Sequence, residues 1–287
     1  MLYEEADMFK KIEEIKSYFQ KRDEVLMAFL FGSSSKGYET LDSDIDIAVY
    51  LKPKEGIEVE EKRDYPQRDK IWSDLVKILE RDNIDVVVLN MANPVLASDV
   101  LENGVPLVIK DENLYWEFYE IISREAEDFY QFVEDYWQIY QEAKSLIPQQ
   151  RVRLLERLQF LDIELQELPI YRNLTFETYR DDKVQRRNIE RWIETLANAT
   201  IDIAKVILAS ERKNMPKSYQ EALLNFGSFF GLNTQEAEKF SEVAKLRNIL
   251  AHEYLEILYK KIRYFLFEIS PFYERLLSFL KEYIKPR

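Results

Sequence analysis

The sequence predicts two domains of different fold class, an α+β domain with a mixed sheet in residues 1–147 and an all-α helical bundle in residues 148–287. The chain has 287 residues, which is more than one hydrophobic core usually serves. Strand-like runs alternate with helical patterns in the first half, and only helical patterns follow. The charge also changes, because the first half carries a net charge of −16 and the second a net charge of +3.

The first half contains four strand-like runs. Apolar residues at helical spacing over residues 8–19 predict an opening helix. The runs that predict strands are VLMAFLF (25–31), DIDIAVYL (44–51), IDVVVLN (84–90) and, at a sheet edge, VPLVIK (105–110). A helix that begins at a proline is expected between the second and third strands. A shorter helix follows the third strand, with Asn93 as its N-cap and Gly104 just beyond its end.

The chain is helical in pattern from about residue 113 onward. A long helix over roughly 113–145 ends at the break SLIPQQ. Further helices are predicted over 150–168, 181–210, 218–227, 235–262 and 271–284. Ser218 and Glu221 have the spacing of a capping box, and Ser270 before a proline is a second start signal. The aromatic residues of the long helix stand at helical spacing, so we expect them to pack rather than to stack on bases.

Composition excludes several classes of protein. The charged N-terminal stretch has no signal-type apolar region after it, and no apolar run approaches the roughly 20 residues that span a bilayer. We therefore expect a cytoplasmic protein with no membrane partner. The absence of cysteine excludes disulfides and thiolate metal sites. The acidic first half is a poor nucleic-acid binder without metal ions, whereas the mildly basic second half permits RNA.

A first candidate site begins at GSSSKG, directly after the first predicted strand. Gly32 and Ser33 stand where an apolar strand gives way to a polar turn. Backbone N–H groups at such a turn can hold an anion, because they point outward and carry partial positive charge. The hydroxyl of Ser33 and the cation of Lys36 would add to this. The turn therefore suits an anion, although a Gly-Ser turn is a weak signal by itself.

Three aspartates follow this turn. Asp44 and Asp46 lie two apart on a predicted strand, so both project from one face. Asp85 is near the start of another strand among apolar residues, where a carboxylate without a function is uncommon. Neighbouring carboxylates repel each other unless cations lie between them, and hard oxygen ligands suit Mg²⁺ or Mn²⁺. The set predicts a site for phosphoryl transfer that uses two metal ions.

The spacing Gly-Ser, ten residues, Asp-x-Asp resembles that of the polymerase-β-like nucleotidyltransferases, and most closely the small prokaryotic branch called minimal nucleotidyltransferases. The resemblance continues through IDVVVLNMANPVLASDVLENGVPLVIKDE to about residue 145. It implies that Gly32 and Ser33 hold the phosphates of an ATP substrate. It also implies that Asp44, Asp46 and Asp85 bind two Mg²⁺ or Mn²⁺ ions, and that Asp85 assists deprotonation of the acceptor.

A second candidate site surrounds the only histidine, His252, in LRNILAHEYLE. Asn248 lies four residues before it on the same helix face, and Arg247 lies seven before Tyr254 on a neighbouring face. A histidine can exchange a proton with a ribose 2′-hydroxyl, and an arginine can bind the phosphate, which favours metal-free RNA cleavage. The two faces do not converge on a straight helix, so the site needs a bend or a second copy of the chain. The simpler alternative is a half-buried structural histidine.

RNILAHEY also resembles the arginine–four residues–histidine–x–tyrosine motif of HEPN-domain ribonucleases. From RLLERLQFL onward the chain is similar to the toxin of HEPN/minimal-nucleotidyltransferase toxin–antitoxin pairs. The resemblance implies that Arg247, Asn248 and His252 line an RNA-cleavage site between two HEPN protomers, and hence a homodimer joined through the helical half. It implies that Tyr254 receives AMP, which silences the ribonuclease. In that family the two domains are usually separate chains, whereas here they are joined.

Other functions stay open at this point. An aminoglycoside-type nucleotidyltransferase also joins such a domain to a helical bundle, which would then bind a small-molecule substrate and dimerise without cutting RNA. The acidic first half would suit a cationic substrate of that kind. A nucleotide-binding regulatory module and a HEPN scaffold that no longer cleaves are further alternatives. Labelled ATP with Mg²⁺ separates them, because the label would appear on the protein, on an added small molecule or nowhere.

Overall fold

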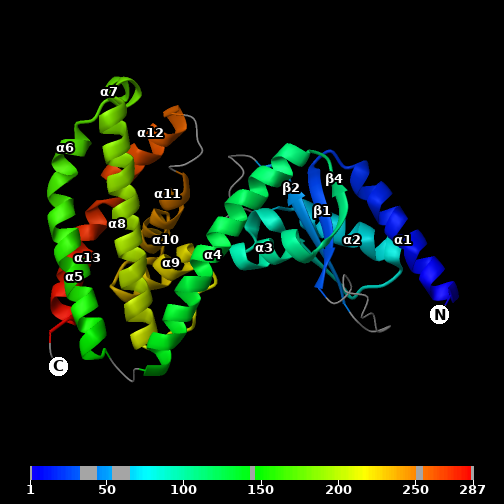
Figure 1. The fold of residues 1–287 in the computed structure, drawn as a ribbon, viewed down its shortest axis with the longest axis horizontal. Coiled ribbons are helices and arrows are strands. Elements are labelled where there is room, and N and C mark those ends of the chain that lie inside the picture. Colours follow the sequence, from blue (N-terminus) through cyan, green and yellow to red (C-terminus); the bar gives the residue numbers. More distant parts are fainter. Residues whose placement is uncertain (1, 33–43, 54–64, 143–145, 250–254, 286–287) are drawn as a thin grey trace. The chain divides into compact units, whose positions relative to one another are not determined.

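A computed structural model of the chain describes residues 2–32, 44–53, 65–142, 146–249 and 255–285 (Figure 1). The chain divides into two compact units, Met1–Tyr130 and Gln131–Arg287. The first unit contains a sheet with helices, and the described part of the second contains helices only. The predicted order of a mixed-sheet domain and a helical bundle is confirmed. The division between the compact units falls within one long helix, and the domain boundary after residue 147 stays a prediction.

The sheet of the first unit has four strands in the order β3-β2-β1-β4. They are β1 (Val25–Phe31), β2 (Ile45–Leu51), β3 (Ile84–Val88) and β4 (Val105–Ile109). Strand β1 is antiparallel to both β2 and β4, whereas β2 and β3 are parallel, so the sheet is mixed. All four predicted strands are present, and β4 lies at an edge as expected. Strand β3 ends at Val88, two residues early.

The helices of the first unit follow from local signals. They are α1 (Leu2–Gln20), α2 (Gln67–Leu79), the 3₁₀ turn η2 (Leu89–Met91), α3 (Pro94–Asn103) and the start of α4 (Glu112–Glu142). The side chain of Asn93 accepts from Leu96 N–H at 2.9 Å, which confirms the predicted N-cap of α3. Turn η2 ends β3 because the buried Asn90 is bonded through its side chain to the N–H and C=O of Leu51.

Helices cover both faces of the sheet (Figure 1). One core contains Phe19 of α1 and Leu75 of α2, with the odd-numbered residues of β2, Ile45 to Leu51. The other core contains Val100 of α3 and Phe118 of α4, with the even-numbered residues of β2, Ala48 and Tyr50. This alternation follows from the two-residue period of a strand. It places the even-numbered positions of β2 on the face that α3 and α4 cover.

The second unit is a helical bundle. Besides the end of α4, it contains α5 (Pro148–Glu164), η3 (Leu165–Glu167), α6 (Leu168–Arg172), α7 (Phe176–Asp181), α8 (Lys183–Ser210), α9 (Tyr219–Phe229), α10 (Thr234–Ser241), α11 (Val243–Ile249), α12 (Leu255–Tyr264), the π-helical η4 (Phe265–Ile269) and α13 (Pro271–Tyr283). Helix α8 is buried along most of its length and packs against α5, α7, α9 and α11. Among the described residues, no helix is both long enough and apolar enough to cross a bilayer.

The second unit departs from the prediction at one long segment. A single helix was expected over 235–262, but α10 ends at Ser241 and α11 begins at Val243. The hydroxyl of Ser241 donates to Glu238 O at 2.7 Å, so this side chain competes for a backbone acceptor of the helix. The start of α9 agrees better, because Ser218 accepts from Glu221 N–H as an N-cap. The Glu221 carboxylate, however, accepts from Lys217 N–H rather than from the cap residue.

Candidate functional site

Two of the three predicted carboxylates face each other across neighbouring strands. Asp46 of β2 and Asp85 of β3 are partners in the parallel register. Val86 and Val88 belong to the core under α1 and α2, so Asp85 lies on the opposite face, the same face as Asp46. Asp44 lies two residues earlier, just before β2, and is exposed. The strand register therefore brings Asp85 beside Asp46, although the two are 39 residues apart in the sequence.

The electrostatics of this group are unfavourable to a charged Asp46. Partial burial raises the pKa of Asp46 above its usual range, and the negative charges of Asp85 and Asp44 raise it further. Each ionised carboxylate thus makes the next harder to ionise. A cation beside the three oxygens would relieve this repulsion. Strained electrostatics of this kind are common where a protein binds charged ligands.

Gly32 packs directly against the Asp46 carboxylate. Its φ is +73°, a left-handed conformation that side chains rarely adopt. A Cβ atom added to Gly32 would lie 2.1 Å from Asp46 Oδ2, so no side chain fits. The turn after β1 therefore meets the carboxylate through its backbone, as the predicted phosphate-holding role of Gly32 requires. Ser33 and Lys36 lie outside the described residues.

Arg68 of α2 is a neighbour of the carboxylates that the sequence did not reveal. Its Nη2 lies 3.8 Å from Asp85 Oδ1, and its Nε donates to Val86 O at 2.9 Å. Trp72, one turn further along α2, donates its indole N–H to Ile84 O at 3.0 Å. Both acceptors belong to β3, an edge strand, so α2 covers the open edge with side-chain donors. Arg68 and Asp85 are both more than half exposed, so their ion pair is weak.

The oxygen atoms of the three carboxylates are ligands that suit hard divalent ions. Among the described residues, no three acidic or histidine side chains are arranged to hold a metal ion by themselves. Mg²⁺ rarely uses such a closed protein cage, because it is usually bound by one or two carboxylates together with substrate phosphates and water. Asp44, Asp46 and Asp85 would supply those carboxylates. Gly32 places a backbone turn, with no side chain, directly beside Asp46.

The second predicted site is described only in part. Arg247, near the end of α11, is half-buried, and its guanidinium lies 5.0 Å from the ring centroid of Tyr219. Tyr219 begins α9, and its ring contacts Phe132 of α4 edge-on at 5.4 Å. Asn248 is the next residue of α11. His252 and Tyr254 lie outside the described residues. The structure therefore places the Arg247 guanidinium over the ring of Tyr219, and the role of His252 stays a prediction.

Comparison with known families matches both halves of the chain. Residues 13–113 match the family described as "Polymerase beta, Nucleotidyltransferase", and residues 150–280 match "Ribonuclease HepT-like". The chain is a fused nucleotidyltransferase–HEPN protein. The resemblances that the two sequence motifs carried are thereby confirmed. The carboxylates and Gly32 belong to the nucleotidyltransferase domain, and Arg247 belongs to the HEPN domain.

Individual relatives cover one domain at a time. The "tRNA nuclease HepT" of Aphanizomenon flos-aquae is 28% identical over 101 residues, which cover 35% of this chain and 69% of that protein. A crystal structure of a toxin–antitoxin with AMP-PNP is 25% identical, covers 43% of this chain and 89% of that chain, and has a TM-score of 0.33. A structure of a tri-AMPylated Shewanella oneidensis HEPN toxin in complex with an MNT antitoxin is 22% identical. The match covers 45% of this chain and 97% of that chain, with a TM-score of 0.32.

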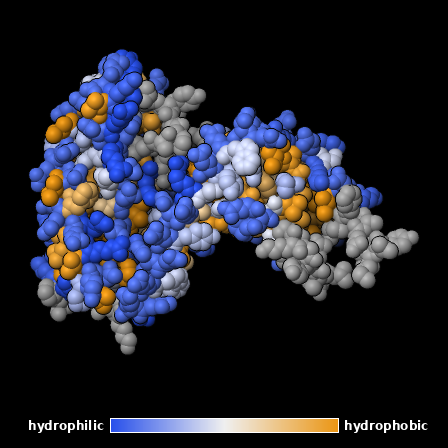
Figure 2. Space-filling view, viewed as in Figure 1, coloured by the Kyte–Doolittle hydropathy of each residue, from blue (hydrophilic) through white to orange (hydrophobic). Residues whose placement is uncertain are grey.

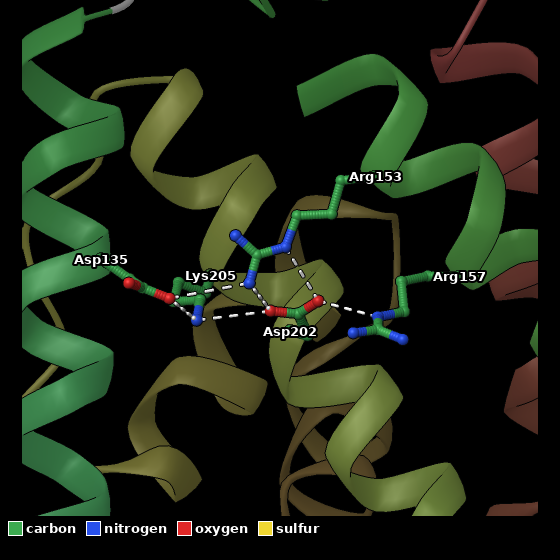
Figure 3. Close-up of polar contacts among 5 residues, drawn as sticks. All are labelled: Asp135, Arg153, Arg157, Asp202 and Lys205. Carbon is green, nitrogen blue, oxygen red and sulfur yellow. Dashed lines mark hydrogen bonds and ion pairs between the residues drawn. The ribbon is translucent and has the colours of Figure 1, made fainter. Parts of the chain in front are cut away.

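The HEPN domain also holds a charged cluster that the sequence did not single out (Figure 3). Asp202 of α8 accepts from both Arg153 and Arg157 of α5, and Lys205 of α8 donates to Asp135 of α4 at 2.6 Å. Burial alone would raise the pKa of Asp202, but the hydrogen bonds from the two arginines lower it below its usual range. Every charge in the cluster has an opposite partner, so the cluster joins three helices rather than offering free groups to a substrate.

A pocket of about 420 Å³ lies elsewhere in the HEPN domain, at the C-terminal end of α8. Its lining residues are Leu208, Lys213, Asn214, Asn225, Ser228 and Phe229. None of these is a predicted site residue. The loop that carries Lys213 is held in place by the Tyr136 hydroxyl, which donates to Lys213 O at 2.8 Å.

Proposed function

We propose that the nucleotidyltransferase domain transfers AMP from ATP to Tyr254, and that the HEPN domain is an RNA endonuclease which this transfer silences. The observation that carries the first part is the pairing of Asp46 with Asp85, next to a glycine that no side chain can replace. A strained acidic pair beside an open backbone turn suits a metal–triphosphate substrate better than a structural role. The HepT-like family match supports the second part.

The transfer needs three tasks from the protein. The backbone at Gly32, with Ser33 and Lys36, holds the phosphates of ATP. Asp44, Asp46 and Asp85 would hold two Mg²⁺ or Mn²⁺ ions, which when bound would supply positive charge that offsets the triphosphate. Asp85 takes the proton of the acceptor hydroxyl. A bond then forms between the tyrosine oxygen and the α-phosphorus, and the bond from that phosphorus to pyrophosphate breaks.

The HEPN site would cleave RNA without a metal ion. His252 exchanges the proton of a ribose 2′-hydroxyl, while Arg247 and Asn248 bind the phosphate, so the products are a 2′,3′-cyclic phosphate and a 5′-hydroxyl. AMP on Tyr254 adds a negative phosphate seven residues along the sequence from Arg247. That phosphate would occupy Arg247 and repel the RNA backbone.

Labelled ATP tests the transfer. Wild-type protein incubated with α-labelled ATP and Mg²⁺ should gain AMP, which mass spectrometry should locate on Tyr254. Tyr254→Phe should block most labelling, whereas Tyr130→Phe, at an exposed tyrosine of α4, should not. Asp46→Asn should lose transfer by orders of magnitude with its fold intact. Full labelling of Tyr254→Phe, or label only on an added aminoglycoside, would overturn this acceptor.

Two variants can show whether the donor site and the acceptor lie on one chain. Asp46→Asn keeps the acceptor Tyr254 but lacks transfer, and Tyr254→Phe keeps transfer but lacks the acceptor. The two variants are mixed and incubated with labelled ATP. Label on Asp46→Asn then means that transfer occurs between chains.

RNA cleavage is tested on the same proteins. Unmodified wild type should cut RNA and should stop when AMP is attached. His252→Ala should not cut RNA and should still accept AMP, because the histidine has no part in transfer. Tyr254→Phe should cut RNA whether or not ATP is present. Undiminished cleavage by AMP-modified protein would refute the regulatory link while leaving both activities standing.

A further inference from the structure

A π-helical turn separates α12 from α13 and turns one aromatic side chain outward. In η4 (Phe265–Ile269) the N–H of Ser270 donates to Phe265 O, five residues back, at 2.8 Å. The Ser270 hydroxyl donates to Leu266 O at 2.7 Å, so the carbonyl that the wider turn releases is satisfied. Phe265, Leu266 and Ile269 are buried, but Phe267 is 44% exposed. Single π-helical turns occur frequently at functional sites.

The guanidiniums of two arginines lie close to the exposed ring of Phe267. The guanidinium carbon of Arg263, in α12, lies 4.1 Å from the ring centroid. That of Arg172, at the end of α6, lies 5.9 Å from it. Both distances are within the range of a cation–π interaction. Segments about 90 residues apart in the sequence therefore present one aromatic ring and two cations together.

The hydrogen bonds of these arginines go to neutral acceptors. Arg172 donates to Leu266 O at 3.2 Å and to the Ser270 hydroxyl at 3.1 Å, and Arg263 donates to Arg172 O at 3.2 Å. In the described part of the chain, neither arginine forms an ion pair with a carboxylate. The adjacent Glu268 is already paired with Lys239 at 2.9 Å. Each guanidinium has five N–H donors, so both retain capacity for a ligand.

We propose that Phe267, Arg172 and Arg263 form a platform for single-stranded RNA. A base would stack on the exposed ring, and the neighbouring phosphates would bind the two guanidiniums. Exposed aromatic rings beside cations bind single strands in this way, because every base has a stacking face and every nucleotide carries a phosphate. The proposal rests on the proposed ribonuclease function for the identity of the ligand, but it concerns residues outside the histidine motif.

Along the chain, α12 separates the platform from the histidine motif. Phe267 follows Leu255, the first described residue of α12, by 12 positions, which corresponds to roughly 18 Å along a helix. RNA bound at the platform would therefore contact the HEPN domain at residues outside the motif. Phe267, Arg172 and Arg263 are thus binding residues and take no part in bond cleavage.

Binding is measured by the anisotropy of a short fluorescein-labelled single-stranded oligoribonucleotide, with His252→Ala as the parent to prevent cleavage. Adding Phe267→Ala should weaken binding by roughly 5- to 100-fold, the effect of losing one stacked base. Trp137→Ala is the matched control, because Trp137 is also 44% exposed but lies in α4, and it should bind like the parent. Arg263→Gln should weaken binding and should reduce the slope of log affinity against log salt by about 0.7, one phosphate contact.

Three outcomes would overturn the platform. The first is binding by Phe267→Ala within twofold of the parent. The second is equal weakening by Trp137→Ala. The third is a change from dimer to monomer on light scattering of Phe267→Ala, which would make the ring a contact between two copies. Cleavage by wild type separates the proposals. If wild type cleaves RNA and Phe267→Ala binds RNA as its parent does, only the platform is refuted. If Phe267→Ala weakens binding but wild type cleaves no RNA, only the ribonuclease function is refuted.

Discussion

Asp46 occupies a position that is electrostatically unfavourable in the metal-free fold. Its strand position places it opposite Asp85 and against Gly32, and neither neighbour offsets its negative charge. Asp85 adds negative charge, and the backbone at Gly32 leaves no space for a shielding side chain. The structure tolerates this arrangement because the opposite face of β2 is a continuous apolar core.

Asp46→Asn should therefore stabilise the metal-free protein at neutral pH while abolishing transfer. The folded-state pKa of Asp46 is raised above its unfolded value, so the folded state holds this proton more tightly. Stability from this group is lost as pH rises from the unfolded pKa through the folded pKa. The neutral asparagine removes that loss.

Thermal melting in the presence of a chelator measures this effect. The melting temperature of Asp46→Asn should exceed that of wild type at pH 7, and the difference should shrink in acid, where wild-type Asp46 is protonated. Asp82→Asn, at an exposed aspartate before β3, is the control and should show no such gain. A lower melting temperature for Asp46→Asn at pH 7 would show that repulsion does not govern this site.

Strand alternation made Asp44 and Asp46 predictable as a pair on one face, because side-chain direction within a strand depends only on sequence position. That Asp85 lies beside Asp46 depends instead on the parallel pairing of β2 with β3. The contact between Gly32 and Asp46 was not predictable in detail, since it depends on the register of β1 against β2. Arg68 was missed for a similar reason. Nothing near it in the sequence indicates that α2 covers the open edge of β3.

At the scale of elements, one charged cluster ties α4, α5 and α8 together. Asp202 and Lys205 have only 12% and 10% of their side chains exposed, so both depend on their partners. Arg153 contacts Asp202 of α8 and also lies 3.6 Å from Asp135 of α4. The end of α4 is thereby fixed to the bundle by charge as well as by apolar packing.

Asp202→Asn should destabilise the HEPN domain by about 3 kcal/mol, the lower end of the cost of breaking a buried ion pair, because Arg157 is partly exposed to solvent. The folded pKa of Asp202 is lowered, so its contribution is present above the unfolded pKa and is lost as pH falls through the folded pKa. Urea unfolding should therefore show a large difference from wild type at pH 7 and a smaller one in acid. Asp162→Asn, at an exposed pair with Lys281, should cost far less.

Long elements with one apolar face were predictable, and short or interrupted ones were not. Helix α3 begins and ends where its capping residues indicate. Helices α6 and α7, with five and six residues, are too short for a helical period to stand out. The predicted helix over 235–262 is interrupted because the Ser241 hydroxyl takes a backbone acceptor, which apolar periodicity does not register.

At the scale of the whole molecule, the HEPN domain has an apolar face without a partner in the described chain. Val152, Leu155 and Ile163 share one face of α5 and are all exposed, opposite the buried face that holds Leu154 and Leu158. Figure 2 shows apolar side chains along this edge of the HEPN domain. Such a face suits self-association, in line with the homodimer that the sequence led us to expect.

Light scattering at micromolar concentration should therefore give the mass of a dimer. Val152→Glu together with Ile163→Glu should give a monomer, because each would place a charge in an apolar interface. The same change at Val184, an exposed apolar residue of α8, is the control and should leave the dimer intact. RNA cleavage should be lost with the dimer if the site needs two protomers. A stable wild-type monomer would exclude that composite site.

The π-helical turn at Phe265–Ile269 also bears on how such a protein can change over generations. A turn closed over five residues instead of four holds one residue more than the α-helical turn it replaces. Ile262 before the turn and Tyr273 after it both face the core, and Phe267 within it is exposed. Gain of a single codon is thus one way in which such a turn, and with it an outward-facing position, can arise in a helix. Insertion, rather than substitution, becomes an economical genetic route to a new surface.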